Sequence, residues 1–316
     1  MMNLMIGPCP VCSAADAQIA DVYRGVHSAF KGLHRAQCRS CGLSFASPMP
    51  DEDDLNDYNS SYFEAAHGGT TTNKTALAFF KAIGRLRKAY VKTYLSSKQI
   101  VVEKVLEIGP GPGFFASSWL EKYPHTTYLA KETDVSCHPG LNAIGVQVLD
   151  DVLEVTAKVS VDLVVMSHVL EHVADPKSFI IDGTQSLRSG GVLFVEVPCL
   201  DYMHKPIDEP HLLFFDKMSM EHLLRSAGFE NVELAYFGQE IQSLSSESIF
   251  RSKLMAVRSK LIALGVLWPF GRKRKGMETL LSSLERASVA PFKAHLKSSE
   301  PTWWLRAVAR KKTNWG

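Results

Sequence analysis

The 316-residue chain has no strong excess of either charge, because 35 Lys and Arg residues nearly balance 33 Asp and Glu residues. A net charge of +2 counts against a nucleic acid as the main partner. The chain also lacks a run near the roughly 20 apolar residues that span a bilayer; its longest candidate covers only 261–270. Residues 1–6 lack the charged start and apolar core of a signal peptide. We therefore expect a cytoplasmic protein.

Internal repeats and low-complexity tracts are also absent from the sequence. Its length is sufficient for one large domain with a small one beside it. A turn-rich acidic segment at 47–54 marks the end of a first unit. We expect a small module over 1–60, a linker and amphipathic helix over 61–100, and a large domain over 101–316.

Cysteine is scarce, and four of the six cysteines form two Cys-x-x-Cys pairs. In a reducing compartment this pattern favours a metal over disulfides, and the alternative of a redox-active pair is less favoured when two pairs are present. Four thiolates fill the tetrahedral shell of Zn²⁺, so we predict a structural site in a zinc-ribbon-like module. The predicted ligands are Cys9, Cys12, Cys38 and Cys41.

From residue 101 onward, strand-like and helix-like segments alternate, which is typical of an α/β fold with a mostly parallel sheet. The expected strands are 101–108, 127–132, 146–149, 161–167, 192–197, 231–237 and 303–311. The expected helices are 114–123, 176–188 and 219–227. Residues 240–300 have a helical and basic pattern, and we interpret them as an insertion before the last of seven strands in a Rossmann-like sheet.

The most informative segment joins the first of these strands to the first helix. Glu107 lies near the end of an apolar strand, and Gly109, Gly111 and Gly113 follow at alternate positions. A dinucleotide-binding fingerprint would place its third glycine at position 114, which is Phe114. Glycines after a strand let the backbone approach a bound ligand at the sheet edge.

This Glu-x-Gly-x-Gly-x-Gly pattern resembles motif I of class I S-adenosylmethionine-dependent methyltransferases. The resemblance implies a seven-stranded methyltransferase sheet and S-adenosylmethionine as cofactor. It also implies that Glu107 and the backbone of Gly109 and Gly111 face the methionine part of the cofactor, with Gly113 in the same loop. A carboxylate beside a sulfonium and an ammonium group is electrostatically favourable.

Acidic residues near the ends of the next two strands are further candidates for cofactor binding. Glu132 can accept hydrogen bonds from a ribose diol, with Asp134 as its competitor and a solvated carboxylate as the alternative. Asp150 and Asp151 end the third strand, where methyltransferases of this class hold the adenine amino group; the alternative there is a plain turn.

A second motif, His168-x-x-Glu171-His172, matches a zinc-peptidase pattern. That pattern requires a helix, which places both histidines on one face, whereas His168 here closes an apolar strand. The stretch also resembles the segment after the fourth strand of methyltransferases, where His-Val-Leu-Glu-His precedes an Asp-Pro, here at 175–176. We therefore predict that His168 is a pocket residue of the cofactor or the acceptor, while Glu171 and His172 orient the loop.

The order of motifs from the cysteine pairs to motif I resembles bacterial sugar- and polysaccharide-associated methyltransferases, including deoxysugar C-methyltransferases. Those proteins carry a Glu-His pair after the fifth strand, which corresponds to Glu209 and His211. The resemblance implies His211 as general base and Glu209 as the group that fixes its tautomer. The alternative is a loop histidine packed on Phe214 and Phe215. Pro210 separates the pair here, so O-methylation fits at least as well as C-methylation.

The predicted function is methyl transfer from S-adenosylmethionine to a hydroxyl or carbon of a sugar, nucleotide-sugar or glycan precursor. The alternatives are O- or N-methylation of a natural product and, in another class, a nucleic-acid-binding zinc protein. Basic and apolar residues interleave at 251–275. That segment fits a lid over the acceptor pocket or peripheral contact with the inner face of a membrane.

Overall fold

The protein was examined as a computed structural model, which describes residues 6–24, 28–51, 53–55, 58, 74–149, 160–204, 207, 211–244, 257 and 293–313. The predictions for Asp150, Asp151, Glu209 and nearly all of 251–275 therefore lie outside the described residues. Within the described ranges, no helix combines the length and apolar character needed to cross a bilayer.

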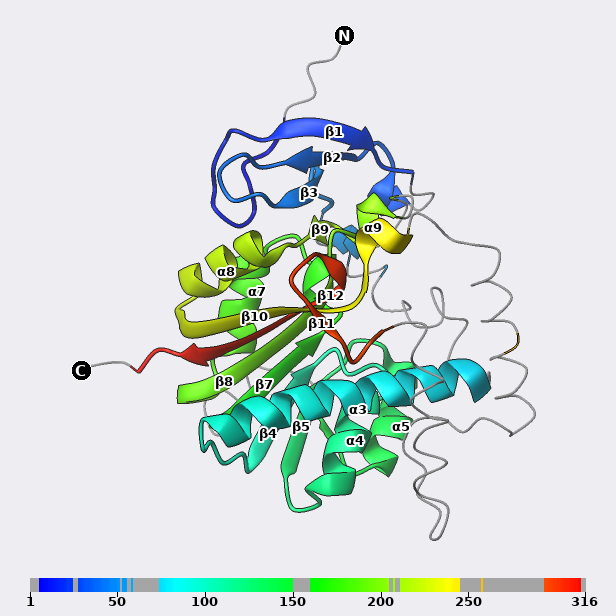
Figure 1. Cartoon of the computed structure of the whole chain (residues 1–316), viewed down its shortest axis with the longest axis vertical. Coiled ribbons are helices and arrows are strands. Elements are labelled where there is room, and N and C mark those ends of the chain that lie inside the picture. The colour runs from blue at the N-terminus through cyan, green and yellow to red at the C-terminus, as the bar shows by residue number, and fades with distance from the viewer. Residues whose placement is uncertain are drawn as a thin grey trace.

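A mixed sheet forms the centre of the large domain (Figure 1). Over the described residues its eight strands are β4 (Lys104–Ile108), β5 (Thr127–Lys131), β6 (Gln147–Val148), β7 (Val161–Ser167), β8 (Leu187–Pro198), β10 (Phe229–Glu240), β11 (Lys297–Ser298) and β12 (Thr302–Lys311). Their spatial order is β11-β10-β12-β8-β7-β4-β5-β6. The strands from β8 to β6 in that order pair in parallel, whereas β12 is antiparallel to both β8 and β10.

This strand order locates the edge of the sheet where a ligand would bind. The chain starts the parallel sheet at β4, adds β5 and β6 on one side, and then crosses to β7 and β8 on the other. The carboxyl ends of β4 and β7 therefore flank a topological switch point, which is where open α/β sheets bind small molecules.

Helices cover both faces of the sheet (Figure 1). Val105 and Val165 face a core that includes α3 and α4, whereas Leu106 and Val164 face the core that includes α7 and α8. Apolar residues on both faces are expected of parallel strands covered by helices. The longer helices are α3 (Lys74–Ser97), α4 (Phe114–Lys122), α7 (Pro176–Gly183) and α8 (Lys217–Ser226); shorter ones are α5 (His138–Ala143) and α9 (Ile241–Leu244).

The N-terminal module is built around a second, antiparallel sheet of β1 (Gln18–Val22), β2 (His34–Gln37), β3 (Ser44–Ser47) and β9 (Leu213–Phe214). Its fourth strand, β9, comes from the large domain and pairs with β3. The Ala46 amide donates to the Leu212 carbonyl at 2.8 Å, and the Arg35 guanidinium lies 3.9 Å from the centre of the Tyr202 ring. The module and the large domain therefore share a sheet and a core.

Two expectations about the large domain are wrong in detail. The expected seven strands become eight over the described residues, because the two-residue strand β11 pairs with β10. The helix expected over 176–188 ends at Gly183, and β8 already begins at Leu187. Gly190 and Gly191, which follow the expected end of that helix, lie inside β8 where its pairing with β7 shifts register. Gly190 has φ of 69°, which suits an irregular point in a strand.

Candidate active site

The predicted strand, glycine loop and helix are present at the switch point. Gly109, Gly111 and Gly113 have φ values of 65°, 53° and 74°, in the left-handed region that glycine adopts without strain. A Cβ atom on Gly109 would lie 2.5 Å from Cγ2 of Val169, which follows His168 in the loop after β7. The loops after β4 and β7 are therefore in direct contact, and neither leaves room for a side chain at Gly109.

Glu107 is a buried carboxyl near the end of β4, 2% exposed. The hydroxyl of Tyr128 in β5 donates to it at 2.6 Å. Burial raises the pKa of Glu107 to about 7, although the Tyr128 hydroxyl and the positive charge of Arg87 act in the opposite direction. A cationic ligand in this part of the site would favour the ionised carboxylate.

Glu132 directly follows β5 and is hydrogen-bonded to the glycine loop. Its Oε2 accepts from the Gly111 amide at 2.7 Å, and its Oε1 accepts from the Asp134 amide at 2.9 Å. Burial raises the pKa of this carboxyl. The competitor Asp134 instead accepts from the Ser136 amide and caps the short helix η2 (Val135–Cys137). Of the two carboxylates, Glu132 is the one joined to the glycine loop.

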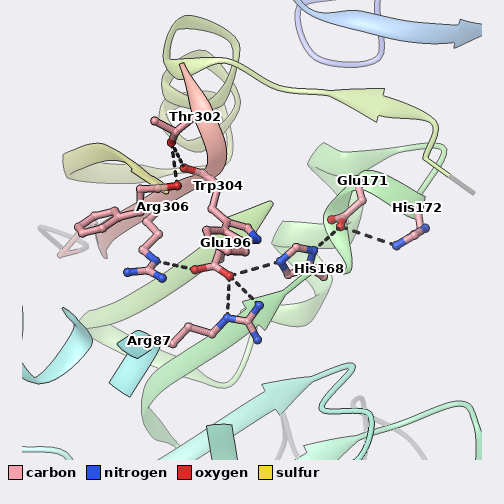
Figure 2. A network of polar contacts seen from close by, with 9 residues as sticks. Arg87, His168, Glu171, His172, Glu196, Thr302, Trp304 and Arg306 are labelled. Carbon is pink, nitrogen blue, oxygen red and sulfur yellow. Dashed lines mark hydrogen bonds and ion pairs between the residues drawn. The ribbon is translucent and has the colours of Figure 1, made fainter. Parts of the chain in front are cut away.

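His168 lies just after β7 with φ of 57°, and its side chain lies between two buried carboxylates (Figure 2). Its Nδ1 is 3.3 Å from Glu171 Oε1, and its Nε2 is 3.3 Å from Glu196 Oε1. Burial by itself would lower the pKa of His168, but the two carboxylates raise it above its usual value. His168 therefore connects the loop after β7 with the end of β8.

Glu196 connects three elements that are far apart in the sequence (Figure 2). Arg87 in α3 donates to it through Nε at 2.6 Å, and Arg306 in β12 donates through Nε at 2.5 Å. Burial alone would raise the pKa of Glu196, but the two guanidinium groups hold it well below its usual range. Our sequence reasoning missed this network. The sequence feature that could have indicated the network is a charged residue within each of two apolar strands, Glu196 in β8 and Arg306 in β12.

His211 lies just before β9. Its Nδ1 is 2.6 Å from Oδ2 of Asp201, a buried residue of the short helix η4 (Asp201–Met203). The ring of His211 makes an edge contact with His172, with 5.1 Å between centroids. The residue seen to orient His211 is thus Asp201, which the sequence did not indicate, while the expected partner Glu209 lies outside the described residues.

The zinc-peptidase pattern does not form its helical arrangement. His168 leaves the strand with a left-handed backbone, and the helix that follows, η3 (Leu170–His172), is a short 3-10 turn. His168 and His172 consequently contact Glu171 from different sides, as Figure 2 shows.

The four cysteines of the N-terminal pairs come together in one cluster. The Sγ atoms of Cys9 and Cys41 are 3.5 Å apart, as are those of Cys12 and Cys38, and all four lie within 4.8 Å of one another. None of them is in a disulfide. Tetrahedral Zn²⁺ with bonds of about 2.3 Å needs sulfurs about 3.8 Å apart, so the cluster fits that ion.

A family model described as a methyltransferase domain matches residues 81–234. No curated protein matches the chain. Among solved structures, an S-adenosylmethionine-dependent methyltransferase from Thermotoga maritima is 15% identical, with a TM-score of 0.49 over 82% of this chain and 100% of that one. Another from Archaeoglobus fulgidus is 15% identical, with a TM-score of 0.41 over 71% and 94%.

The family match spans the glycine loop, Glu132, His168 and His211, and it starts within α3 and ends within β10. It therefore includes the whole parallel part of the sheet and the switch point described above. Over residues 81–234, just under half of its length, the chain is thus similar to a methyltransferase domain.

Proposed function

We propose that the chain is an S-adenosylmethionine-dependent methyltransferase and that it acts on a hydroxyl or carbon of a sugar, nucleotide-sugar or glycan precursor. The observation that carries the proposal is the His211–Asp201 pair, which lies beside the loop after β7, the loop whose Val169 packs against Gly109. A basic imidazole at that place suits an acceptor that loses a proton, such as a hydroxyl or an acidic carbon.

In this proposal the cofactor lies over the carboxyl ends of β4 and β5. Glu107 faces the sulfonium and ammonium groups, whose positive charge favours its ionised form. The loop of Gly109 and Gly111 lets the backbone approach the methionine part, and Glu132 accepts from the ribose hydroxyls with lone pairs left beyond its two amide bonds. Asp150 and Asp151 remain predictions from sequence for the adenine amino group.

The reaction is an in-line displacement at the methyl carbon. A lone pair of the acceptor forms the new bond to that carbon, and the carbon–sulfur bond breaks with its electrons on sulfur, giving neutral S-adenosylhomocysteine. The acceptor gives up one proton. Asp201 accepts from Nδ1 of His211, which leaves Nε2 as the basic nitrogen to take that proton. His168 is paired with Glu171 and Glu196. In this proposal it positions the loop after β7 between the cofactor and the acceptor.

We further propose that Cys9, Cys12, Cys38 and Cys41 hold a structural Zn²⁺. All four coordination positions are then filled by thiolates, so the ion leaves no open position for catalysis. Because β3 of this module pairs with β9, the zinc module supports the segment that carries His211. The reducing conditions of the cytoplasm would keep the thiols available, and membrane contact through 251–275 stays a prediction from sequence.

An acceptor screen tests the proposal directly. S-adenosylmethionine labelled in its methyl group would be incubated with free sugars, nucleotide sugars and glycan precursors in one set, and with phenolic and amine natural products in another. We expect label in the first set, with loss of that label in His211→Ala. Label confined to the second set would replace the sugar assignment with natural-product methylation.

A further inference from the structure

Three metal-ligating side chains meet on the acceptor side of the site. A carboxylate oxygen of Glu171, one ring nitrogen of His172 and one ring nitrogen of His211 all lie within 4.8 Å of one another. Two imidazoles and one carboxylate form a ligand set that suits divalent transition-metal cations and leaves coordination positions open. The first two residues belong to the His-x-x-Glu-His motif, whose peptidase interpretation the structure does not support.

The fold fixes these side chains relative to one another by backbone contacts. Glu171 and His172 lie in η3, directly after β7. The Leu212 amide, next to His211, donates to the Glu171 carbonyl at 2.7 Å. Two segments that are separate in sequence are thereby joined at the point where the three side chains meet, so the cluster does not depend on flexible surface groups.

The surroundings of Glu171 favour a cation at this cluster. Its side chain is 1% exposed, and among the described residues neither carboxylate oxygen accepts a hydrogen bond of good geometry. The nearest nitrogens are Nδ1 of His168 at 3.3 Å and Nε2 of His172 at 3.7 Å. A buried carboxylate is costly unless it is well paired, and a cation between Glu171 and the imidazoles of His172 and His211 would add to the long contacts that Glu171 makes with His168 and His172.

The partner of His211 is the second argument for a metal. Metal-binding histidines commonly donate their other ring N–H to a carboxylate, which fixes the ring and its tautomer. Asp201, 3% exposed, holds Nδ1 of His211 in this way at 2.6 Å and leaves Nε2 for a ligand.

The position of the cluster relates it to the reaction. Val169 lies between His168 and Glu171 in the chain and touches the glycine loop at Gly109. An acceptor oxygen bound at the cluster would therefore be close to the methyl donor.

We propose that Glu171, His172 and His211 bind a divalent transition-metal cation whose open positions take the acceptor hydroxyl. This inference rests on the proposed function and deepens it. The cation lowers the pKa of the hydroxyl. The O–H bond breaks with its proton passing to water, an oxygen lone pair forms the bond to the methyl carbon, and the carbon–sulfur bond breaks with its electrons on sulfur. Nε2 of His211 is then bound to the cation and cannot take the proton, so this step replaces the role of general base given to His211 under the proposed function.

The test is a Mn²⁺ titration of the full chain with Zn²⁺ already on the cysteines, followed by electron paramagnetic resonance and calorimetry. Mn²⁺ prefers nitrogen and oxygen ligands, so the thiolate cluster does not compete for it. We expect one site per chain. Glu171→Gln and His172→Ala should abolish it, and Asp201→Asn should weaken it about 10- to 100-fold. His222→Ala, an exposed histidine of α8, is the matched control and should leave binding unchanged.

The outcomes separate this inference from the proposed function. If the wild-type chain binds neither Mn²⁺ nor added Zn²⁺ beyond the cysteine-bound ion, the cation site is wrong, whatever the variants do. Methylation of a sugar by that metal-free protein would leave the proposed function standing. Conversely, cation binding that Glu171→Gln removes, in a protein that methylates no sugar, would support the site and contradict the sugar assignment.

Discussion

The proposed cofactor half and the proposed acceptor half of the site are assembled in different ways. The cofactor half comes from one continuous stretch, in which Glu107, the glycine loop and Glu132 belong to two neighbouring strands and their loops. The acceptor half joins Glu171, Asp201 and His211 from separate segments. A site whose residues are close in sequence can be predicted from a local motif. A site whose residues come from separate segments depends on the fold and on the elements that hold those segments together.

The largest expected effect concerns the support that the proposed zinc module gives to the acceptor half. Cys9→Ser with Cys41→Ser should abolish zinc binding and methyl transfer, because β9 loses the sheet with which it pairs. Structural zinc contributes on the order of 10–16 kcal/mol in small zinc domains. Zinc content, turnover and S-adenosylhomocysteine affinity would be measured together.

If the two halves are assembled separately, the cofactor half should keep its structure in this variant. The affinity for S-adenosylhomocysteine should then change by less than about threefold. Cys137→Ala, at a buried cysteine outside the cluster, is the control and should retain zinc and turnover. Equal loss of cofactor affinity and turnover would mean that the two halves are not separable.

The next largest effect is expected from Glu196→Ala, which leaves Arg87 and Arg306 without their shared carboxylate. Removing one partner of a buried ion pair costs about 3–5 kcal/mol. Chemical denaturation would measure the loss of unfolding free energy. The control is Glu233→Ala in β10, whose ion pair with Lys98 is exposed and therefore contributes little to stability. Similar losses in both variants would contradict the structural role of the network.

His211→Ala should lower turnover by about 10²- to 10⁴-fold, the range typical of lost proton-transfer chemistry. Affinity for S-adenosylhomocysteine should stay unchanged, because His211 belongs to the acceptor half. Steady-state kinetics with calorimetry would measure both quantities. Wild-type turnover in this variant would make His211 a structural residue only.

A smaller, graded effect of pH is expected on the affinity of the cofactor half for S-adenosylmethionine. With its pKa raised to about 7, Glu107 is largely neutral below that pH and gains charge above it. Affinity for cationic S-adenosylmethionine should therefore rise from about pH 6 to pH 8, by up to about tenfold per pH unit below the pKa. Glu107→Gln should flatten this profile. Calorimetry at several pH values in buffers of different ionisation heat would also detect the proton released on binding.

The same group has an opposite effect on the stability of the free protein. The folded state holds the Glu107 proton more tightly than the unfolded chain, whose carboxyl has a pKa near 4.5. Glu107 therefore costs stability as pH rises from about 4.5 through about 7. Denaturation curves of wild type and Glu107→Gln should diverge over that window, with the variant the more stable at pH 8. Parallel curves would show that this carboxyl is not perturbed by burial.

The parts of the fold that the sequence predicts well depend on local pattern. The strand predicted at 161–167 is β7, and the helix predicted at 114–123 is α4 within a residue. The predicted end of α7 is wrong because Arg188, which we expected in the helix, lies in β8 and pairs with Asp162 across the sheet at 2.6 Å. No local sequence pattern predicts that contact.

The site divides in the same way. The sequence favoured Glu132 over Asp134, and the structure joins Glu132 to the glycine loop. Asp201 was missed because nothing near it in the sequence marks its contact with His211. Arg306 was missed although a charge within an apolar strand was visible, since its partner Glu196 lies in another strand.

Titration of S-adenosylhomocysteine into the wild-type chain and into Gly109→Ala tests the central claim most directly. The account predicts clear binding heat for the wild type and none for the variant, because a Cβ at Gly109 would meet Val169 and strain a left-handed backbone. Absence of heat with S-adenosylhomocysteine, together with clear uptake of a nicotinamide dinucleotide or a nucleoside triphosphate, would contradict it.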